Sequence, residues 1–329
     1  MTAGERLASA AAVAPHLGRR FRHVKLNRQT LVNLAFAGVL IALIVVAALT
    51  TDGFFTESNL RNLSRQMVTT GLLSLGMLVV IYTGGIDLSV GSILALAGVL
   101  ATGLSASMPI PLAMAVAVVV GVACGAVNGV LVGRFLLAPF IVTLAALTTV
   151  RGLAFVYTET PIQASDASFL ALGTNQIGPV PLATVIMLLA FAVVWLFINR
   201  SAAGRAIVAI GGNTEAVRLA GISVSRHLIL AYVISGFCAG LAGVILASRV
   251  GIAQPSVGVA FELDAIAACV IGGASLAGGR GSVVGALFGV VVLALIDNLL
   301  NFYGVQSFYQ QVLKGLIIVV VVLARRREQ

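Results

Sequence analysis

Side chains that could do chemistry are few in this chain, and their spacing excludes several enzyme classes. The three histidines are His16, His23 and His227, and none belongs to an H-E-x-x-H pair that would hold a catalytic zinc. The only lysines, Lys25 and Lys314, do not follow a glycine, so no G-x-x-x-x-G-K-[ST] loop can bind ATP phosphates. A G-x-S-x-G elbow for a nucleophilic serine is absent as well. We therefore expect a protein that is not an enzyme and has no cofactor, metal or ATP site of its own.

A few charged residues fall in or beside long apolar segments. They are Asp87, Arg151, Glu262, Asp264, Asp297 and Lys314. A charge in hydrocarbon is costly, and it suggests a functional role by default. A proton or ion relay would spread carboxylates through the depth of the bilayer, whereas Asp297 and Lys314 fall in the same half of adjacent segments. We prefer a structural ion pair between Asp297 and Lys314 over a role in a pathway, and we expect Asp87 to cap a helix that begins at Leu88.

One long internal stretch, residues 199–228, concentrates positive charge. It holds Arg200, Arg205, Arg218 and Arg226. Each of these charges would cost about 2.5 to 3.5 kcal/mol at the centre of a membrane, so the stretch must lie in water.

The elements that must position these residues are membrane-spanning helices. Of 329 residues, 60% are hydrophobic and only 9% are charged, whereas about 25% are charged in soluble domains. The apolar runs are continuous and about 20 residues long, which suits helices that cross ~30 Å of hydrocarbon better than the alternating strands of a barrel. We predict an all-α polytopic helical bundle of about ten spans. They are expected at about 31–50, 66–83, 88–106, 109–133, 139–158, 181–199, 228–248, 262–278, 282–303 and 308–324.

Two of these spans are open to a second interpretation. Glycine and proline interrupt the surroundings of 88–106 and 262–278, so these segments are either full spans or broken, re-entrant helices. The sequence does not choose between them.

The distribution of basic residues predicts the orientation of the chain. With the N-terminal tail (1–30) inside, the inner side receives that tail's basic residues, Arg134, the arginines of the loop 200–227, Arg280 and the basic C-terminus (325–329). Only Arg61, Arg65 and Arg249 fall outside. This bias obeys the positive-inside rule, so we expect an inner-membrane protein with one transmembrane domain (31–324) and both termini in the cytoplasm. The net charge of +9 then reflects topology and not nucleic-acid binding.

Two further features concern loops and helix contacts. The longest outer loop, Glu159 to Pro181, has no lysine or arginine and is either a surface for a soluble partner or a connector. Glycines recur at every fourth position in 121–129 and 281–289, a spacing that lets helices approach closely in lipid.

Five motifs in order along the chain resemble the permease subunit of ribose-type sugar ABC importers. They are Gly84-Gly-Ile-Asp-Leu-Ser-Val-Gly91, Asn128-Gly129 with Pro139-Phe-Ile-Val-Thr143, Gly211-Gly-Asn-Thr-Glu-Ala-Val-Arg-Leu-Ala-Gly-Ile222, Phe261-Glu-Leu-Asp-Ala-Ile-Ala-Ala268 and Gly272-Gly-Ala-Ser-Leu-Ala-Gly-Gly-Arg-Gly-Ser282. The resemblance covers roughly residues 35 to 324. It includes the branch that serves xylose, galactose, arabinose and related sugars.

The resemblance implies a type II importer-like subunit with several partners. These are a second permease copy, identical or closely related, a cytoplasmic ATPase with tandem nucleotide domains that binds ATP and Mg²⁺, an external sugar-binding protein, and membrane lipid. It also implies that residues 215–221 are similar to a coupling loop whose short helix docks on the ATPase. The residues that carry this expectation are Asn213, Glu215, Ala216, Arg218, Leu219 and Gly221. Val217 replaces the second alanine of the family pattern, which could alter the docking face.

The residues themselves support a short helix in this loop. Asn213 or Thr214 can cap it, Glu215 suits its first turn, and Gly221 ends it, which leaves Arg218 exposed to a partner. The alternative is an ordinary solvated loop.

The passage for the sugar is less defined in the sequence. Ser89, Asn128, Thr143, Asn298 and Asn301 could pair with sugar hydroxyls, and each could equally be a hydrogen-bonding contact between helices. A secondary transporter or channel that needs no ATPase is the alternative function. The identity of the sugar is not readable from these residues.

Overall fold

A computed structural model describes residues 28–51, 53–164 and 166–326, and it divides the chain into two units. The first unit ends at Ala42, and its described part, residues 28–42, lies entirely in helix α1 (Arg28–Thr50). The second unit begins at Leu43 and holds all the other elements. The predicted tail 1–30 therefore falls almost wholly outside the described residues, as does most of the C-terminal segment 325–329.

The second unit is built mainly from helices, joined by short loops. The helices are α2 (Glu57–Tyr82), α3 (Val90–Leu104), α4 (Ile110–Gly133), α5 (Pro139–Tyr157), α6 (Ala167–Thr174), α7 (Leu182–Arg200), α8 (Ala202–Gly212), α9 (Thr214–Leu219), α10 (Val224–Val250), α11 (Phe261–Ile271), α12 (Val283–Phe302) and α13 (Ser307–Arg326). Four two-residue strands accompany them: β1 (Ile162–Gln163), β2 (Gln176–Ile177), β3 (Val180–Pro181) and β4 (Ile252–Ala253). The predicted all-α class agrees with this architecture.

The count of about ten spans is not confirmed. Among the described residues, six helices are long and apolar enough to cross a membrane: α2, α4, α5, α7, α10 and α12. The predicted spans 31–50 and 308–324 correspond to α1 and α13. In both helices the structure describes the side chains of only some residues.

The two segments with an open interpretation form short helices. Helix α3 has 15 residues and α11 has 11, so they rise about 22 Å and about 17 Å, less than the ~30 Å of a full span. Each is joined to a long neighbouring helix, α2 and α12 respectively, by a loop with a glycine in the left-handed region, Gly84 or Gly273. The geometry favours broken helices over full spans at both places.

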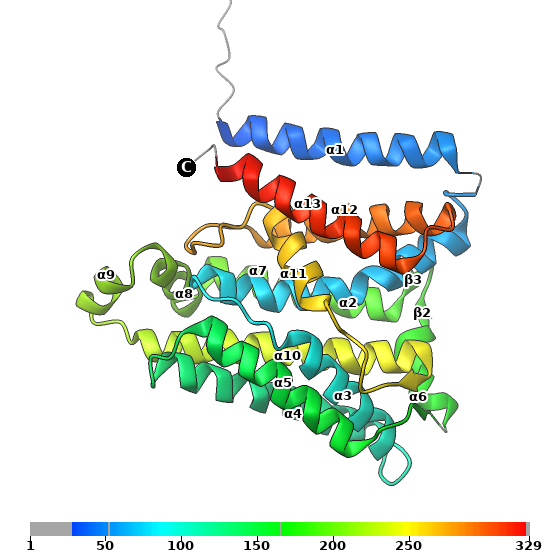
Figure 1. Cartoon of the computed structure of the whole chain (residues 1–329), viewed down its shortest axis with the longest axis horizontal. Helices are drawn as coiled ribbons and strands as arrows, with labels where there is room; N and C mark the ends of the chain where they lie inside the picture. Colours follow the sequence, from blue (N-terminus) through cyan, green and yellow to red (C-terminus); the bar gives the residue numbers. More distant parts are fainter. Residues whose placement is uncertain (1–27, 52, 165, 327–329) are drawn as a thin grey trace, which may run out of the picture. The chain divides into compact units, whose positions relative to one another are not determined.

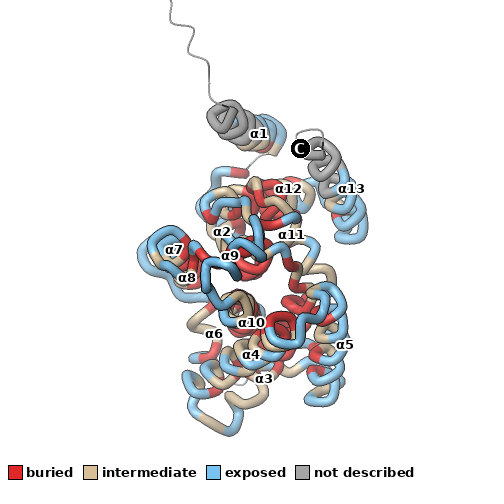
Figure 2. The backbone as a smooth tube through the Cα atoms, turned by 90° about the vertical axis from the view of Figure 1, so that its left-hand side faces the viewer, coloured by how far each residue is buried: buried red, intermediate tan, exposed pale blue. Residues whose placement is uncertain are grey.

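Helix α10 is the centre of the second unit. Figure 1 shows it between α2 on one side and α3 and α4 on the other, and the tube in Figure 2 is buried where these helices face one another. Its buried residues include Tyr232, Ser235 and Cys238, each at most 1% exposed.

Glycines permit the closest of these contacts, as their spacing predicts. A methyl group on Gly125 of α4 would overlap the carbonyl oxygen of Tyr232 and lie 3.0 Å from Gly236 Cα of α10. In the second series, Gly285 and Gly289 of α12 face the backbone of Gly272 and Ala268. Backbones that touch in this way gain van der Waals contact where lipid offers no hydrophobic driving force.

The described residues of the segment 159–181 contact the bundle. Strand β1 pairs antiparallel with β4, with Ile162 opposite Ala253, and β2 pairs with β3. The hydroxyl of Ser248 on α10 donates to Phe169 O (2.6 Å) and accepts from the Gly173 N–H (2.8 Å) of α6. These contacts hold the described part of the segment against α10 and β4.

Candidate functional site

Helices α8 and α9 lie within the stretch 199–228, between the end of α7 and the start of α10, and a single residue separates them. Asn213 ends α8 and also caps α9, because its side-chain oxygen accepts a hydrogen bond from the Ala216 N–H (2.9 Å). Glu215 lies in the first turn of α9, and Gly221, with φ +76°, follows its end. Capping by an asparagine and termination by a left-handed glycine are the features that the sequence predicts for a short helix here.

Helix α9 presents one face outward and one inward. Glu215 and Arg218 form an exposed ion pair of 2.6 Å, and Ala216 is exposed as well. Leu219, a large apolar side chain, is 78% exposed on the same helix. Val217 is only 7% exposed and points into the protein, so the replacement of alanine at this position does not alter the outward face.

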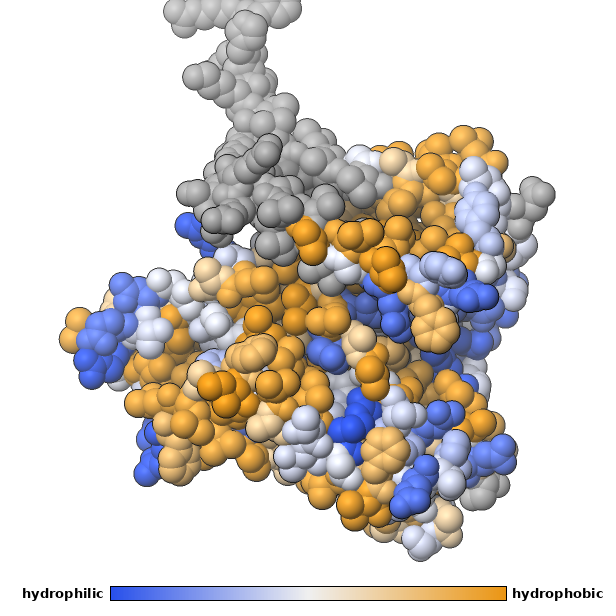
Figure 3. Space-filling model, in the orientation of Figure 1, coloured by the Kyte–Doolittle hydropathy of each residue, from blue (hydrophilic) through white to orange (hydrophobic). Residues whose placement is uncertain are grey.

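The position of α9 places this face at one end of the second unit. Figure 1 shows α8 and α9 projecting from the end where α7 finishes and α10 begins. In the same orientation, Figure 3 shows hydrophilic residues gathered at the α9 end and at the opposite end, with a broad hydrophobic surface between them. Such a distribution fits a bundle that crosses a bilayer with α9 in the water phase.

A buried polar cluster forms in the break between α2 and α3. Asp87, which is 0% exposed, accepts hydrogen bonds from Ser89 N–H (3.0 Å), Ser89 Oγ (2.6 Å) and Ser235 Oγ of α10 (2.8 Å). Asn128 of α4 donates to Ser89 Oγ (2.9 Å). The expected cap at Leu88 is corrected: α3 begins at Val90, and Asp87 bonds Ser235 of α10 in addition to the local contact with Ser89.

Thr143 belongs to the same region of the bundle. Its hydroxyl lies 3.1 Å from Ile86 O and 2.9 Å from Pro139 O, and it is 0% exposed. It therefore ties the start of α5 to the break after α2.

The last two pathway candidates also contact protein. Asn298 of α12 exchanges side-chain hydrogen bonds with Asn59 of α2, at 2.9 and 3.2 Å. Asn301 accepts from Gln310 of α13 (2.9 Å). Ser89, Asn128, Thr143 and Asn298 are each at most 5% exposed, so this conformation brings three of them together near Asp87 and presents none of the four to a passage. Only Asn301 is exposed.

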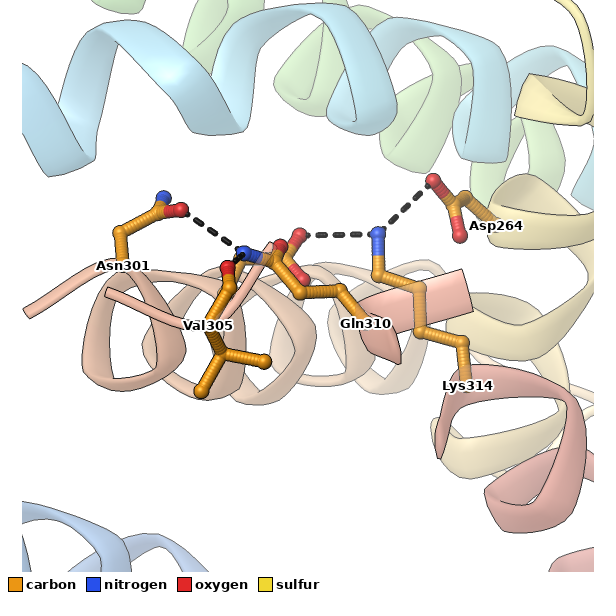
Figure 4. Close-up of polar contacts among 6 residues, drawn as sticks. Asp264, Asn301, Val305, Gln310 and Lys314 are labelled. Carbon is orange, nitrogen blue, oxygen red and sulfur yellow. Dashed lines mark hydrogen bonds and ion pairs between the residues drawn. The ribbon is translucent and has the colours of Figure 1, made fainter. Parts of the chain in front are cut away.

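The predicted contact between Asp297 and Lys314 is present and has a third member. Lys314 Nζ lies 3.0 Å from Asp297 Oδ2 and 3.1 Å from Asp264 Oδ2. Figure 4 shows the ammonium group reaching from α13 to Asp264 of α11, beside the contact of Gln310 with Asn301. One cation thus holds α13 against both α11 and α12, and two carboxyl groups share it.

The other intramembrane cation, Arg151, fixes a loop. Its guanidinium donates to Pro255 O and to Val257 O, both at 2.5 Å. These carbonyls belong to the loop between β4 and α11. Arg151 therefore attaches the loop that leads into the short helix α11 to α5. The same segment covers a mostly apolar cavity of about 140 Å³ between α3 and α10, to which Gln254 contributes a polar side chain.

Sequence reasoning missed three of these relationships. It gave Asp264 no partner and Arg151 no role, and it did not connect Asp87 with Ser235. The charge inside an apolar segment was the available signal in each case, but the partners lie 50, 104 and 148 positions away in the chain. Within the described residues, no three His, Cys, Asp or Glu side chains meet in a group that could hold a metal ion.

Comparison with known proteins places this chain in a family. The family model described as branched-chain amino acid transport system / permease component matches residues 59–322. A ribose import permease of Bacillus subtilis is 43% identical over 89% of this chain and 92% of its own length, and one of Haemophilus influenzae is 41% identical over 87% and 90%. An L-arabinose ABC transporter permease of Azospirillum brasilense is 35% identical over 95% and 91%. No solved structure matches the chain.

Proposed function

Because this chain belongs to the permease family of ABC importers, in its ribose-type branch, we propose that it forms the passage for a monosaccharide such as ribose and is driven by a separate ATPase that docks on α9. The relatives that match over most of their length are named as permeases for ribose and L-arabinose. A permease of this kind is a multi-pass protein of the inner membrane, which agrees with the six apolar helices of the described chain.

The outward face of α9 is the observation that carries the docking proposal. It combines an ion pair, Glu215 with Arg218, and an exposed leucine, Leu219, on a capped helix in a basic loop. A partner that covers Leu219 removes an apolar side chain from water, and the ion pair gives the contact its orientation. In this proposal the α9 end and both chain termini face the cytoplasm, a second permease copy completes the passage, and an external binding protein delivers the sugar.

The first experiment tests the docking face on the assembled importer. Glu215→Arg and Gly221→Pro are expected to abolish recovery of the ATPase with the tagged permease, while the permease itself stays folded in the membrane. Glu57→Arg is the matched control, because Glu57 is likewise an exposed first-turn carboxylate that pairs with an arginine of its own helix. Full ATPase recovery and ribose transport in both α9 variants would exclude the docking role.

Reconstitution separates this function from the alternative. Liposomes that contain the permease, the ATPase and the binding protein should accumulate radiolabelled ribose only when ATP is supplied. If the permease alone moves ribose without ATP, the chain is a secondary transporter or channel, and the proposal fails.

A further inference from the structure

The end of α8, just before α9, touches both breaks that interrupt the membrane helices. Gly211 lies against Tyr82, where α2 ends, and against Gly278 and Gly279, in the loop between α11 and α12. Gly278 in turn lies against Gly84, which follows the end of α2. We call these five residues the inner junction. A hydrogen bond from the Gly279 N–H to Tyr82 O (3.0 Å) holds the two breaks together at this point.

Backbone contacts make the inner junction tight. A methyl group on Gly211 would overlap Tyr82 O and Gly279 N, and one on Gly278 would lie 2.8 Å from Gly84 N and 2.9 Å from Gly211 Cα. Because these are main-chain atoms and not the ends of flexible side chains, the contact cannot adapt by a change of rotamer.

No free linker separates the inner junction from α9. Asn213 N–H donates to Ala209 O (3.0 Å), and the Thr214 hydroxyl donates to Ile210 O (2.8 Å), so the first residues of α9 are bonded to the last turn of α8. A displacement of α9 therefore moves Gly211 with it.

Beyond the inner junction, each break leads to a polar contact inside the bundle. The first break carries Asp87, which is bonded to Ser235 of α10. The second break follows α11, whose Asp264 is held by Lys314. The inner junction is thus the place where α8 can act on both short helices.

We propose that the inner junction transmits movement of α9 to the breaks before α3 and after α11, and that Gly211 is its positioning residue. This proposal rests on the docking role of α9 given above. The ATPase moves α9, α8 follows as one piece, and the close contact at Gly211 displaces the two breaks together. Without that contact, the ATPase would bind and hydrolyse ATP without opening the passage.

The test compares two adjacent glycines of α8. In Gly211→Ala the new methyl group enters the inner junction, whereas in Gly212→Ala it meets no atom within 4 Å, and neither position needs a left-handed backbone. In the reconstituted importer, Gly211→Ala should retain the ATPase and its ATP hydrolysis but lower the ribose moved per ATP hydrolysed by about fivefold or more, the lower end of the usual range for coupling between two sites. Gly212→Ala should behave as the wild type.

The ratio of ribose moved to ATP hydrolysed distinguishes this role from a purely structural one. A loss of fold would lower ATPase recovery and both activities together. An unchanged ratio in a folded Gly211→Ala importer would overturn the proposal. Since ATPase recovery is measured in the same samples, failure of the docking role, which the Glu215→Arg variant reports, remains distinguishable from failure of the inner junction.

A second measurement keeps the test decisive if Gly211→Ala does not fold. Gly212→Cys and Arg280→Cys replace exposed residues on the two sides of the inner junction, and each can carry a spin label. The distance between the labels should stay the same in the nucleotide-free and vanadate-trapped importer, because the two sides move together. A change of more than about 5 Å, one helical turn, would show that the inner junction separates, and it would refute the proposal.

Discussion

Lys314 of α13 and Asp297 of α12 form an ion pair of 3.0 Å, and Asp264 of α11 shares the same ammonium group at 3.1 Å. These side chains are between 16% and 27% exposed, so water screens them little. The contact explains how a lysine and two aspartates persist in an apolar region, because both carboxyl groups share one ammonium group from a neighbouring helix. The two carboxyl groups therefore depend on Lys314 as their cationic partner.

Replacing that lysine should destabilise the protein through the carboxylates that remain. Lys314→Met leaves Asp264 and Asp297 without a cation, and we expect a loss of about 2–3 kcal/mol, below the range for fully buried pairs because the group is partly exposed. Thermal unfolding of the detergent-purified permease measures it. Adding Asp264→Asn and Asp297→Asn to the same chain should recover most of the loss. Equal stability of Lys314→Met and wild type would contradict this account.

Asn298 is expected to act as a contact between helices and not as a sugar ligand. Asn298→Ala removes both side-chain hydrogen bonds to Asn59 and should cost about 0.6 to 1.7 kcal/mol, with no change in the KM for ribose. A double-mutant cycle with Asn59→Ala should return a coupling free energy, since the two amides pair with each other. A raised KM in the folded variant would instead support the passage role.

Because α4 packs closely on α10, replacing Gly125 by a larger residue should lower the free energy of unfolding. In Gly125→Ala the added methyl group meets the backbone of Tyr232 and Gly236, and we expect a loss of about 1–3 kcal/mol in unfolding free energy. Gly152→Ala on α5 is the control, because nothing lies within 4 Å of its methyl group. The comparison needs only unfolding curves of the two variants. Similar curves would show that α4 can move away from α10 at little cost.

The cap of α9 should matter for coupling more than for overall stability. Asn213→Ala removes the hydrogen bond from the Ala216 N–H and should lower the stability of α9 by about 1 kcal/mol. Because α9 has only six residues and isolated short helices have little stability in water, this loss should be enough to unwind it. Amide hydrogen exchange at residues 214–219 should accelerate, and ATPase recovery should fall.

Asn213→Asp is the matched control for this cap, since aspartate caps helices equally well. It should behave as the wild type. Unchanged exchange rates in Asn213→Ala would show that contacts with the body of the protein, such as burial of Val217, hold α9 without the cap.

The sequence alone determined the features that depend on neighbouring residues. Apolar runs of about 20 residues located α2, α4, α5, α7, α10 and α12, because the cost of burying charge and bare backbone in lipid is a local property. The capped start of α9 at Asn213 and its end at Gly221 were likewise readable, since a cap and a left-handed glycine act within a few residues. The five motifs in order were enough to indicate the family.

Tertiary structure decided which polar and charged groups meet. Hydropathy is the same for a helix that faces lipid and one buried among helices, so it could not show that α3 and α11 stop short of a full span. The pairing of Asp87 with Ser235, of Arg151 with Pro255 and of Lys314 with Asp264 joins residues far apart in the chain. Such contacts depend on how the helices are arranged, and an unpaired charge in an apolar segment shows only that a partner is needed.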